Sequence, residues 1–231
     1  MAAGAIDAPR YLSENYWWAY VHPSAVRLFE RQWLLNLILC GNYSRLRDAA
    51  LDEFGHCLRG RTLQIACVYG DLTQRLAARV SADGVLHVVD ILPVQLANLA
   101  RKLRGHARVR LWLGDSVALG APDASYDRAL LFFLLHEQPE AVRRATLAEA
   151  LRVVKPGGKI VVVEYHAPSR WHPLKALLRP LLRRLEPYAL DLWNDGLSKW
   201  LPDGTAHGVQ KQTYFGGLYQ KTVLTARAAQ R

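Results

Sequence analysis

The chain has 231 residues, of which 51% are hydrophobic and 22% are charged, and its formal net charge is +10 at pH 7. This length and composition fit one globular domain with a sizeable core, and they exclude a disordered or fibrous protein. The three cysteines are odd in number and form no C-x-x-C pair, so neither a disulfide framework nor a cysteine zinc site is expected and a reducing compartment is favoured. The N-terminus shows no signal-peptide pattern, and the apolar runs are too short to span a bilayer.

The first third of the chain predicts an aromatic arm followed by two helices. Residues 9–23, P-R-Y-L-S-E-N-Y-W-W-A-Y-V-H-P, carry five aromatic rings. Such rings stack on flat ligands or sit at membrane interfaces, and the alternative is an arm that packs over the core. Apolar residues at helical spacing then predict one helix over 24–40 whose inner face includes Trp33 and Leu37. A second helix is expected over 43–57.

Residues 61–90 predict a strand, a glycine turn at Gly70, a helix and a second strand that ends on Asp90. This order makes a βαβ unit of about thirty residues. Asp90 follows the glycine turn by roughly twenty residues, the position at which such units bind a ribose hydroxyl. The physical reason is that a tight turn at the sheet edge exposes backbone N–H groups, while a carboxylate accepts two hydroxyl hydrogen bonds.

The following segments continue the alternation of strands and helices. They are a helix over 92–103, a strand over 109–113 closed by Gly114-Asp115, a strand over 128–134, a helix over 140–153, and a strand over 159–163 after the turn V-V-K-P-G-G. Residues 212–226 predict a terminal β-hairpin around Gly216-Gly217. The alternation predicts a doubly wound α/β sheet.

Residues 168–205 predict a basic amphipathic insertion before the hairpin. Leucines of 174–185 share one helical stripe, and four Lys or Arg side chains lie opposite. From Pro168 to the end there are ten Lys or Arg and four Asp or Glu, a net charge of +6. This pattern suits an anionic membrane surface or nucleic acid. The alternative is a lid helix packed on the core, with its arginines merely solvated.

Four features, Gly70, Asp90, Gly114-Asp115 and the V-V-K-P-G-G turn, occur in the order and spacing of a class I S-adenosylmethionine-dependent methyltransferase, which the chain resembles. The resemblance implies a doubly wound, mostly parallel seven-stranded sheet with N-terminal lid helices. It also implies that Asp90 binds the ribose, that Asp115 binds the adenine amino group, and that 66–71 faces the methionine. The implied cofactor-binding residues are Gln64, Ala66, Cys67, Val68, Tyr69, Gly70, Asp90, Ile91, Asp115 and Ser116. The alternative for Asp90 and Asp115 is turn capping.

The arm at 9–23, I-L-C-G-N-Y at 38–43 and A-C-V-Y-G-D at 66–71 also resemble the RquA-type rhodoquinone biosynthesis proteins. Membership implies replacement of a methoxy group of ubiquinone by an amino group, with S-adenosylmethionine as the amino donor and manganese as the metal. It further implies anaerobic respiration and a place on the cytoplasmic face of the inner membrane, or on the matrix side in a mitochondrion. The chain has Gln64 where methyltransferases of this class usually carry an acid. A methionine amine without an anionic partner deprotonates more easily, and only the neutral amine is a nucleophile.

The candidate catalytic residues are Tyr69, His136 and His166. For a metal, His136-Glu137 follows the fourth strand, and Glu164 and His166 follow the fifth. Neighbouring strands would bring these imidazoles and carboxylates to one edge of the sheet, and mixed ligands of this kind suit manganese. Further candidate ligands are Asp115, His22 and Asp71.

The sequence thus predicts a single domain made of an arm and lid helices (1–60), a cofactor-binding core (61–167), the basic insertion (168–205) and a hairpin (206–231). Ubiquinone and a membrane surface are the expected partners, and nucleic acid is not expected. The competing hypotheses are a conventional quinone or phenol methyltransferase, a nucleic-acid-binding module, and a cofactor binder without activity.

Overall fold

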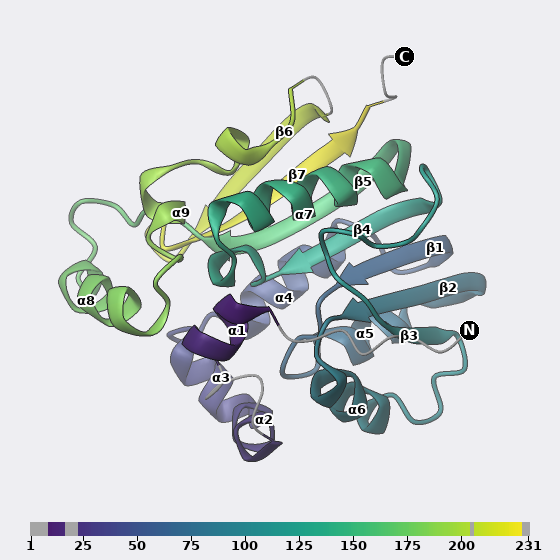
Figure 1. Cartoon of the computed structure of the whole chain (residues 1–231), viewed down its shortest axis with the longest axis horizontal. Helices are drawn as coiled ribbons and strands as arrows, with labels where there is room; N and C mark the ends of the chain where they lie inside the picture. Colours follow the sequence, from purple (N-terminus) through teal and green to yellow (C-terminus); the bar gives the residue numbers. More distant parts are fainter. Residues whose placement is uncertain (1–8, 17–22, 204–205, 228–231) are drawn as a thin grey trace.

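The computed structural model describes residues 9–16, 23–203 and 206–227. Its centre is a seven-stranded sheet in the order β3-β2-β1-β4-β5-β7-β6 (Figure 1). The strands are β1 (Leu58–Ile65), β2 (Val80–Asp90), β3 (Val109–Leu113), β4 (Tyr126–Phe132), β5 (Val154–Tyr165), β6 (Ala206–Tyr214) and β7 (Tyr219–Ala226). β1 to β5 pair in parallel, and β7 is antiparallel to both β5 and β6. The predicted doubly wound, mostly parallel sheet with a terminal hairpin is confirmed.

Helices cover both faces of this sheet, so its central strands are buried on either side. In β4, the consecutive residues Ala129, Leu130 and Leu131 are all fully buried. An apolar run without alternation is what a strand between two helical layers requires. The covering helices are α4 (Tyr43–Asp52), α5 (Leu72–Ala78), α6 (Pro93–Lys102) and α7 (Glu140–Val153). α4 and α7 both pack on β5, and Figure 1 shows α7 in front of the sheet and α4 behind it.

A second group of helices lies beyond the carboxyl ends of the parallel strands (Figure 1). It contains α1 (Arg10–Asn15), α2 (Pro23–Phe29), α3 (Gln32–Ile38) and α8 (Lys175–Leu185). Short helical turns η2 (Leu135–Glu137), α9 (Asp191–Asn194) and η3 (Leu197–Trp200) complete the fold. Because ligands of doubly wound folds bind outside the carboxyl ends of the strands, this helical group surrounds the expected site.

The prediction of one continuous helix over 24–40 is wrong. The chain forms α2 and α3 instead, and the break falls at Glu30 and Arg31. Glu30 turns inward, where its carboxylate forms an ion pair with Lys102 of α6. After the break, Trp33 and Leu37, which the periodicity placed on a buried face, are 61% and 67% exposed. A tertiary ion pair has therefore overridden the helical period.

The aromatic arm packs inward in its described part. Tyr16 is fully buried, and Tyr11 is half-buried beside the pocket described below. Residues 17–22, which carry the remaining aromatic side chains of the arm and His22, lie outside the described part of the chain. For Tyr11 and Tyr16, the alternative of packing over the core is the correct one.

Candidate functional site

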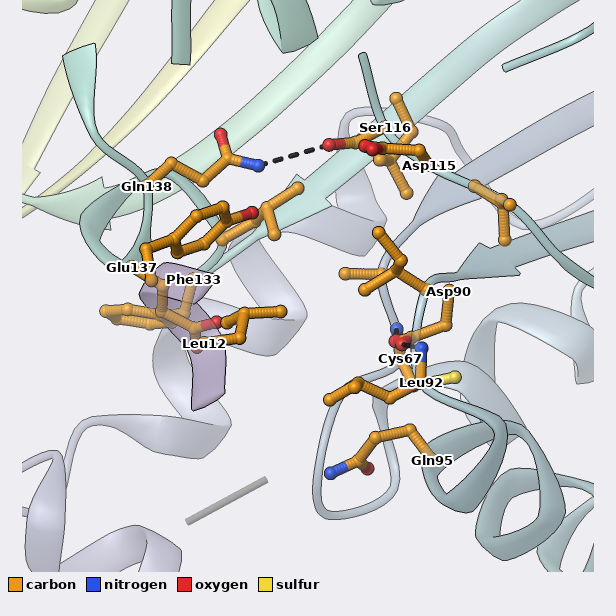
Figure 2. Close-up of a pocket in the computed structure, with 17 residues that line it drawn as sticks. Leu12, Cys67, Asp90, Leu92, Gln95, Asp115, Ser116, Phe133, Glu137 and Gln138 are labelled. Carbon is orange, nitrogen blue, oxygen red and sulfur yellow. Dashed lines mark hydrogen bonds between the residues drawn. The ribbon is translucent and has the colours of Figure 1, made fainter. Parts of the chain in front are cut away.

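A hollow opens at the carboxyl edge of the sheet, between the ends of β1, β2 and β4 and helix α1 (Figure 2). Six of the ten predicted cofactor-binding residues line it: Ala66, Cys67, Asp90, Ile91, Asp115 and Ser116. The other lining residues are Tyr11, Leu12, Ile65, Val89, Leu92, Gln95, Gly114, Phe133, Leu134, Glu137 and Gln138. Figure 2 shows Asp90, Cys67 and Leu92 on one wall, with Leu12, Phe133 and Glu137 on the wall opposite.

Asp90 accepts hydrogen bonds from two backbone segments that line the hollow. Its Oδ2 accepts a hydrogen bond from the backbone N–H of Cys67 at 2.7 Å, and its Oδ1 accepts one from the N–H of Leu92 at 2.8 Å (Figure 2). Burial raises the pKa of Asp90 to about 6, although these N–H groups act to lower it. The same burial, together with Asp90, raises the pKa of the Cys67 thiol, so this cysteine stays protonated.

The opposite end of the hollow carries polar groups suited to a flat heterocycle. Asp115 accepts a hydrogen bond from the N–H of Val117 at 3.1 Å, so it caps its own turn as well as lining the hollow. Gln138 donates to the hydroxyl of Ser116 at 3.1 Å (Figure 2). The Oε1 of Gln138 is buried and has no hydrogen-bond partner among the described residues. An orphaned buried carbonyl oxygen is costly, and Figure 2 shows this one directed away from Ser116 and the hollow.

The altered glycine loop is strained at Ala66. This residue has φ of +72°, a conformation that favours glycine, at a position where this class of fold usually has one. Four residues on, Gly70 also has positive φ, and an added Cβ there would lie 2.4 Å from the Tyr43 hydroxyl. The hydroxyl of Tyr43 accepts hydrogen bonds from the N–H groups of Asp71 and Leu72 and so caps α5. The loop thus keeps the shape of a glycine turn after losing two glycines.

Gln64 lies fully buried under this loop. Its Nε2 donates to the carbonyl of Ala66 at 3.0 Å, and its Oε1 has no partner in the described structure. The position therefore carries a neutral amide in place of a carboxylate. Gln64, Val68, Tyr69 and Gly70, though predicted to bind the cofactor, are not among the residues that line the hollow.

Tyr69 points behind the wall of the hollow. Its hydroxyl accepts a hydrogen bond from Gln95 at 2.8 Å, and its ring stacks on Phe29 with centroids 5.9 Å apart. Burial raises the pKa of this hydroxyl well above its usual range, so it stays protonated and is a poor proton donor. These contacts attach the loop to α2 and α6, and they give the predicted catalytic role of Tyr69 no support.

Glu30 of the lid also reaches the loop. It accepts hydrogen bonds from the N–H of Gly70 at 3.0 Å and from Asn98 at 2.6 Å. Lys102, its ion-pair partner, donates in turn to the carbonyl of Gly70. A carboxylate from outside the core thus fixes the last residue of the glycine turn. Only the tertiary structure reveals this residue, because Glu30 precedes Gly70 by forty positions.

The charged side chains that line the hollow are acidic. Asp90, Asp115 and Glu137 line it, and no Lys, Arg or His contributes to the wall that the described residues form. Burial and these three carboxylates raise the pKa of the Tyr11 hydroxyl, which lies in the same wall. An acidic pocket of this kind favours a cationic ligand.

His136 lies next to the hollow in a buried group of carboxylates. Its Nδ1 is 3.1 Å from Oε2 of Glu164, and its Nε2 is 3.7 Å from Glu137 and 3.6 Å from Glu186. Burial alone would lower the pKa of His136, but the carboxylates of Glu164, Glu186 and Glu137 outweigh it and raise the pKa to about 9. At neutral pH this imidazole is protonated. It therefore neutralises part of the acidic group and is not a ready proton acceptor.

The four predicted metal ligands do not assemble. His136, Glu137 and Glu164 lie together, whereas His166 has its Nδ1 2.8 Å from the carbonyl oxygen of Gly217 and its Nε2 3.4 Å from the ammonium of Lys211. A neighbouring ammonium opposes cation binding at His166. In the part of the chain that the structure describes, no group of three or more His, Cys, Asp and Glu side chains is arranged to hold a metal ion. The residues present do not fit manganese.

The further candidate ligands are also engaged elsewhere or not described. Asp71 forms ion pairs with Arg47 at 2.7 Å and Arg75 at 2.6 Å, which hold its pKa below the usual range against the effect of burial. Asp115 caps its turn and lies on the same wall of the hollow as Asp90 (Figure 2). His22 falls outside the described residues.

The sequence did not predict the residues on the side of the hollow that faces α1 and the insertion. Tyr11 and Leu12 come from α1, Phe133 and Gln138 come from the turn after β4, and Glu186 comes from the insertion. Phe133 has φ of +53°, a strained conformation that nothing in the sequence signals. The N-terminal aromatic cluster was the one available clue, and it was consistent with several roles.

Comparisons with known proteins agree with this geometry. A methyltransferase domain family matches residues 62–158. A demethylmenaquinone methyltransferase from Beutenbergia cavernae is 32% identical over 183 residues, which cover 74% of this chain and 71% of that protein. The ubiquinone/menaquinone biosynthesis C-methyltransferase UbiE from Syntrophotalea carbinolica is 29% identical over 197 residues, covering 84% and 81%. These matches span most of the chain.

A solved structure shows the same fold. Phosphoethanolamine N-methyltransferase 2 from Haemonchus contortus, in complex with S-adenosyl-L-methionine, superposes with a TM-score of 0.70 over 96% of this chain and 61% of that one, at 13% identity. The cofactor in that structure is S-adenosyl-L-methionine, and in this chain Asp90 at the end of β2 and Asp115 after β3 line the hollow at the same edge of the sheet. The chain belongs to the class I S-adenosylmethionine-dependent methyltransferases.

Proposed function

We propose that this protein transfers a methyl group from S-adenosylmethionine to the ring of an isoprenoid quinone in its reduced form. The relatives named as demethylmenaquinone and ubiquinone/menaquinone methyltransferases support this substrate class, since they match across most of the chain. The observation that carries the proposal is the acidic hollow at the carboxyl edge, in which Asp90 stands where a ribose is bound.

The chain's own residues would divide the work between binding and proton transfer. Asp90 would hold the ribose hydroxyls, and Asp115 would hold the adenine amino group. The bound cofactor supplies an electrophilic methyl group on its sulfonium. A ring carbon attacks it best when a neighbouring hydroxyl has lost its proton, so a base must face the hollow. Glu137 is the proposed acceptor, because it lines the hollow while the adjacent His136 is already protonated at neutral pH.

A second candidate reaction is the exchange of a ring methoxy group for an amino group, as in the RquA-type proteins that the sequence resembles. The observation that favours it is Gln64, buried under the loop with its Oε1 unpartnered among the described residues. An amide oxygen would accept a hydrogen bond from the methionine amine but would not hold that amine protonated as a carboxylate does. The neutral amine is the species able to attack the ring carbon that carries the methoxy group, which leaves as methanol. An elimination that breaks the bond between this nitrogen and the methionine Cα must then follow to leave the amino group on the ring. Manganese, the metal implied by that resemblance, finds no matching ligand group in the described residues.

Product mass distinguishes the two reactions. The protein is incubated with S-adenosylmethionine and, in parallel, with a reduced demethylmenaquinone and with ubiquinone, and the quinones are analysed by mass spectrometry. Methyl transfer raises the mass of the quinone, whereas methoxy-to-amino exchange lowers it. An unchanged mass for both substrates, with S-adenosylmethionine bound, would reject both reactions and leave a cofactor binder without this activity.

Gln64→Glu tests the role of the neutral amide. Under amino transfer, the carboxylate keeps the methionine amine protonated, so product formation falls at neutral pH and recovers at higher pH. Under methyl transfer, the pH profile keeps its shape. Gln210→Glu, an exposed glutamine of β6, is the matched control for a change of charge alone.

A further inference from the structure

Large exposed apolar side chains gather at one side of the molecule. Among the described residues, eight large hydrophobic side chains are exposed, and seven of them lie on α2, α3, α8 or the turn before α8. These seven are Leu28, Trp33, Leu37, Ile38, Trp171, Leu177 and Leu181. Figure 1 shows α8 and the α2–α3 pair beyond the carboxyl ends of the parallel strands, where the cofactor hollow opens. The eighth, Val209, lies on the edge strand β6.

The first patch, Leu28, Trp33, Leu37 and Ile38, lies on both sides of the break between α2 and α3. Glu30 turns toward Lys102 at the break, and the residues after it rotate outward. Trp33 and Leu37 lie one helical turn apart and therefore share a face of α3. Single exposed apolar side chains are common. A contiguous group of large ones, in contrast, is typical of a surface that binds a partner or a membrane.

The second patch, Trp171, Leu177 and Leu181, belongs to the insertion. The leucine stripe of α8 divides: Leu182 is buried and Leu178 packs on the core, whereas Leu177 and Leu181 face solvent. Trp171, the most exposed of all at 80%, precedes the helix. The lid-helix alternative therefore accounts for most of the stripe and leaves Leu177 and Leu181 exposed.

The charges around both patches are positive. Residues 23–41 and 169–185 contain seven Lys or Arg and a single acid, Glu30. Glu30 is turned inward onto Lys102, so no exposed acid remains on these two segments. Arg27 and Arg31 are exposed beside the first patch, and Arg183 and Arg184 beside the second. Arg170 lies over the Trp171 ring at 4.8 Å.

We propose that these two patches dock the protein on an anionic phospholipid surface. Apolar side chains interleaved with arginine and no acid match a bilayer interface, where the rings and leucines enter the headgroup region and the guanidinium groups meet phosphates. None of the described helices has the length and hydrophobicity to cross a bilayer, so the attachment is peripheral. Docking in this orientation turns the cofactor hollow toward the membrane. The inference depends on side-chain exposure and charge, and not on which reaction the site performs.

Vesicle co-sedimentation of the full-length protein tests the proposal. We expect binding to vesicles of phosphatidylglycerol and phosphatidylcholine, weaker binding to pure phosphatidylcholine, and a decrease as salt is raised. Trp33→Gln with Leu37→Gln, and separately Leu177→Gln with Leu181→Gln, should each lower the partition coefficient about tenfold, because each pair removes a few kcal/mol of apolar burial only part of which is realised at an interface. Val209→Gln is the matched control and should change the coefficient less than about twofold.

S-adenosylmethionine affinity, measured by calorimetry on every variant, shows whether the fold is intact. Unchanged partition of both double variants, or an equal loss in Val209→Gln, would overturn the proposal. So would the absence of binding to anionic vesicles. A concentration-dependent dimer that the double variants abolish would show that a second copy of the chain covers the patches. Salt-sensitive binding to DNA or RNA without vesicle binding would assign the arginines to nucleic acid.

Discussion

The two walls of the cofactor hollow differ in how they are built. One wall consists of Asp90, Asp115 and the loop at 66–67, all from the core at the ends of successive strands. The other wall consists of Tyr11 and Leu12 from α1 and of Glu137 from the turn after β4, backed by Glu186 of the insertion. The first wall follows the pattern of its family. The second brings together segments separated by more than one hundred residues, such as Tyr16 and the carbonyl of His136.

The difference assigns separate tasks to the two walls. The core wall holds groups that any nucleoside-bearing cofactor needs, and its geometry is set by backbone N–H groups bound to Asp90. The lid wall places a protonated imidazole and three carboxylates beside the hollow. Changes in the core wall should therefore affect cofactor binding, and changes in the lid wall should affect the acceptor reaction and stability.

The largest effect is expected for Asp90→Ala. It removes the ribose acceptor and leaves the N–H groups of Cys67 and Leu92 without their partner. We expect affinity for S-adenosylmethionine to fall roughly 100-fold, about 3 kcal/mol, measured by calorimetry. Asp123→Ala, an exposed acid far from the hollow, should retain the affinity. Wild-type affinity in Asp90→Ala would show that the core wall does not anchor the cofactor.

Breaking the ion pair between Glu30 and Lys102 should have the second largest effect. Glu30→Gln leaves a largely buried ammonium unpaired, and we expect a loss of about 2 kcal/mol in the free energy of unfolding. Denaturant unfolding of Glu30→Gln, Lys102→Met and the double variant measures the coupling between them. Glu14→Gln, an exposed acid of α1, is the matched control. Additive single effects would mean that the lid and the loop are not coupled through this pair.

The raised pKa of His136 predicts that the free energy of unfolding depends on pH. Its pKa of about 9 lies above the ordinary value of 6.5, so the folded protein binds this proton more tightly than the unfolded chain. The stabilisation is complete below about pH 6.5 and is lost as pH rises through 9, with a slope of at most about 1.4 kcal/mol per pH unit. Unfolding measured between pH 6 and pH 10 checks this. Glu186→Gln removes one of the carboxylates and should flatten the slope, whereas an unchanged slope would assign the proton elsewhere.

The raised pKa of Asp90 predicts that the affinity for the cofactor falls at low pH. Its pKa of about 6 exceeds the ordinary 3.8, so the unliganded protein gains stability from this group as pH falls from 6 to 4. S-adenosylmethionine needs the ionised carboxylate, so its affinity should fall by up to tenfold per pH unit below about 6. Calorimetric titrations at several pH values test this. A constant affinity down to pH 5 would contradict it.

The smallest effect is expected for Ala66→Gly. Ala66 is sterically strained at φ of +72°. Glycine removes this strain but makes the unfolded chain more flexible. We expect a net gain of about 0.5 to 1 kcal/mol in the free energy of unfolding. Ala145→Gly, in the middle of α7, should instead lose about 1 kcal/mol. A loss at Ala66 would mean that its methyl group makes packing contacts that outweigh the strain.

The sequence alone was enough to predict the sheet and the core wall. β3 and α7 have the predicted bounds, and Asp90, Asp115 and Ser116 line the hollow as expected. The reason is local: buried parallel strands are continuous apolar runs, and the residue that follows each strand must lie at the carboxyl edge. β5 proved longer than predicted because its pairing with β4 resumes at Val154, before the Pro156 turn, which no apolar pattern marks.

Only the tertiary structure decided the lid and what its side chains do. The helical period predicted Trp33 and Leu37 to be buried, and the ion pair between Glu30 and Lys102 turned them outward. His136 and Glu164 did come together, but His166 was drawn to Gly217 and Lys211. Local spacing determines which residues reach the edge of the sheet. Which of them meet depends on long-range contacts and on the balance between burial and charge, and these exist only in the folded chain.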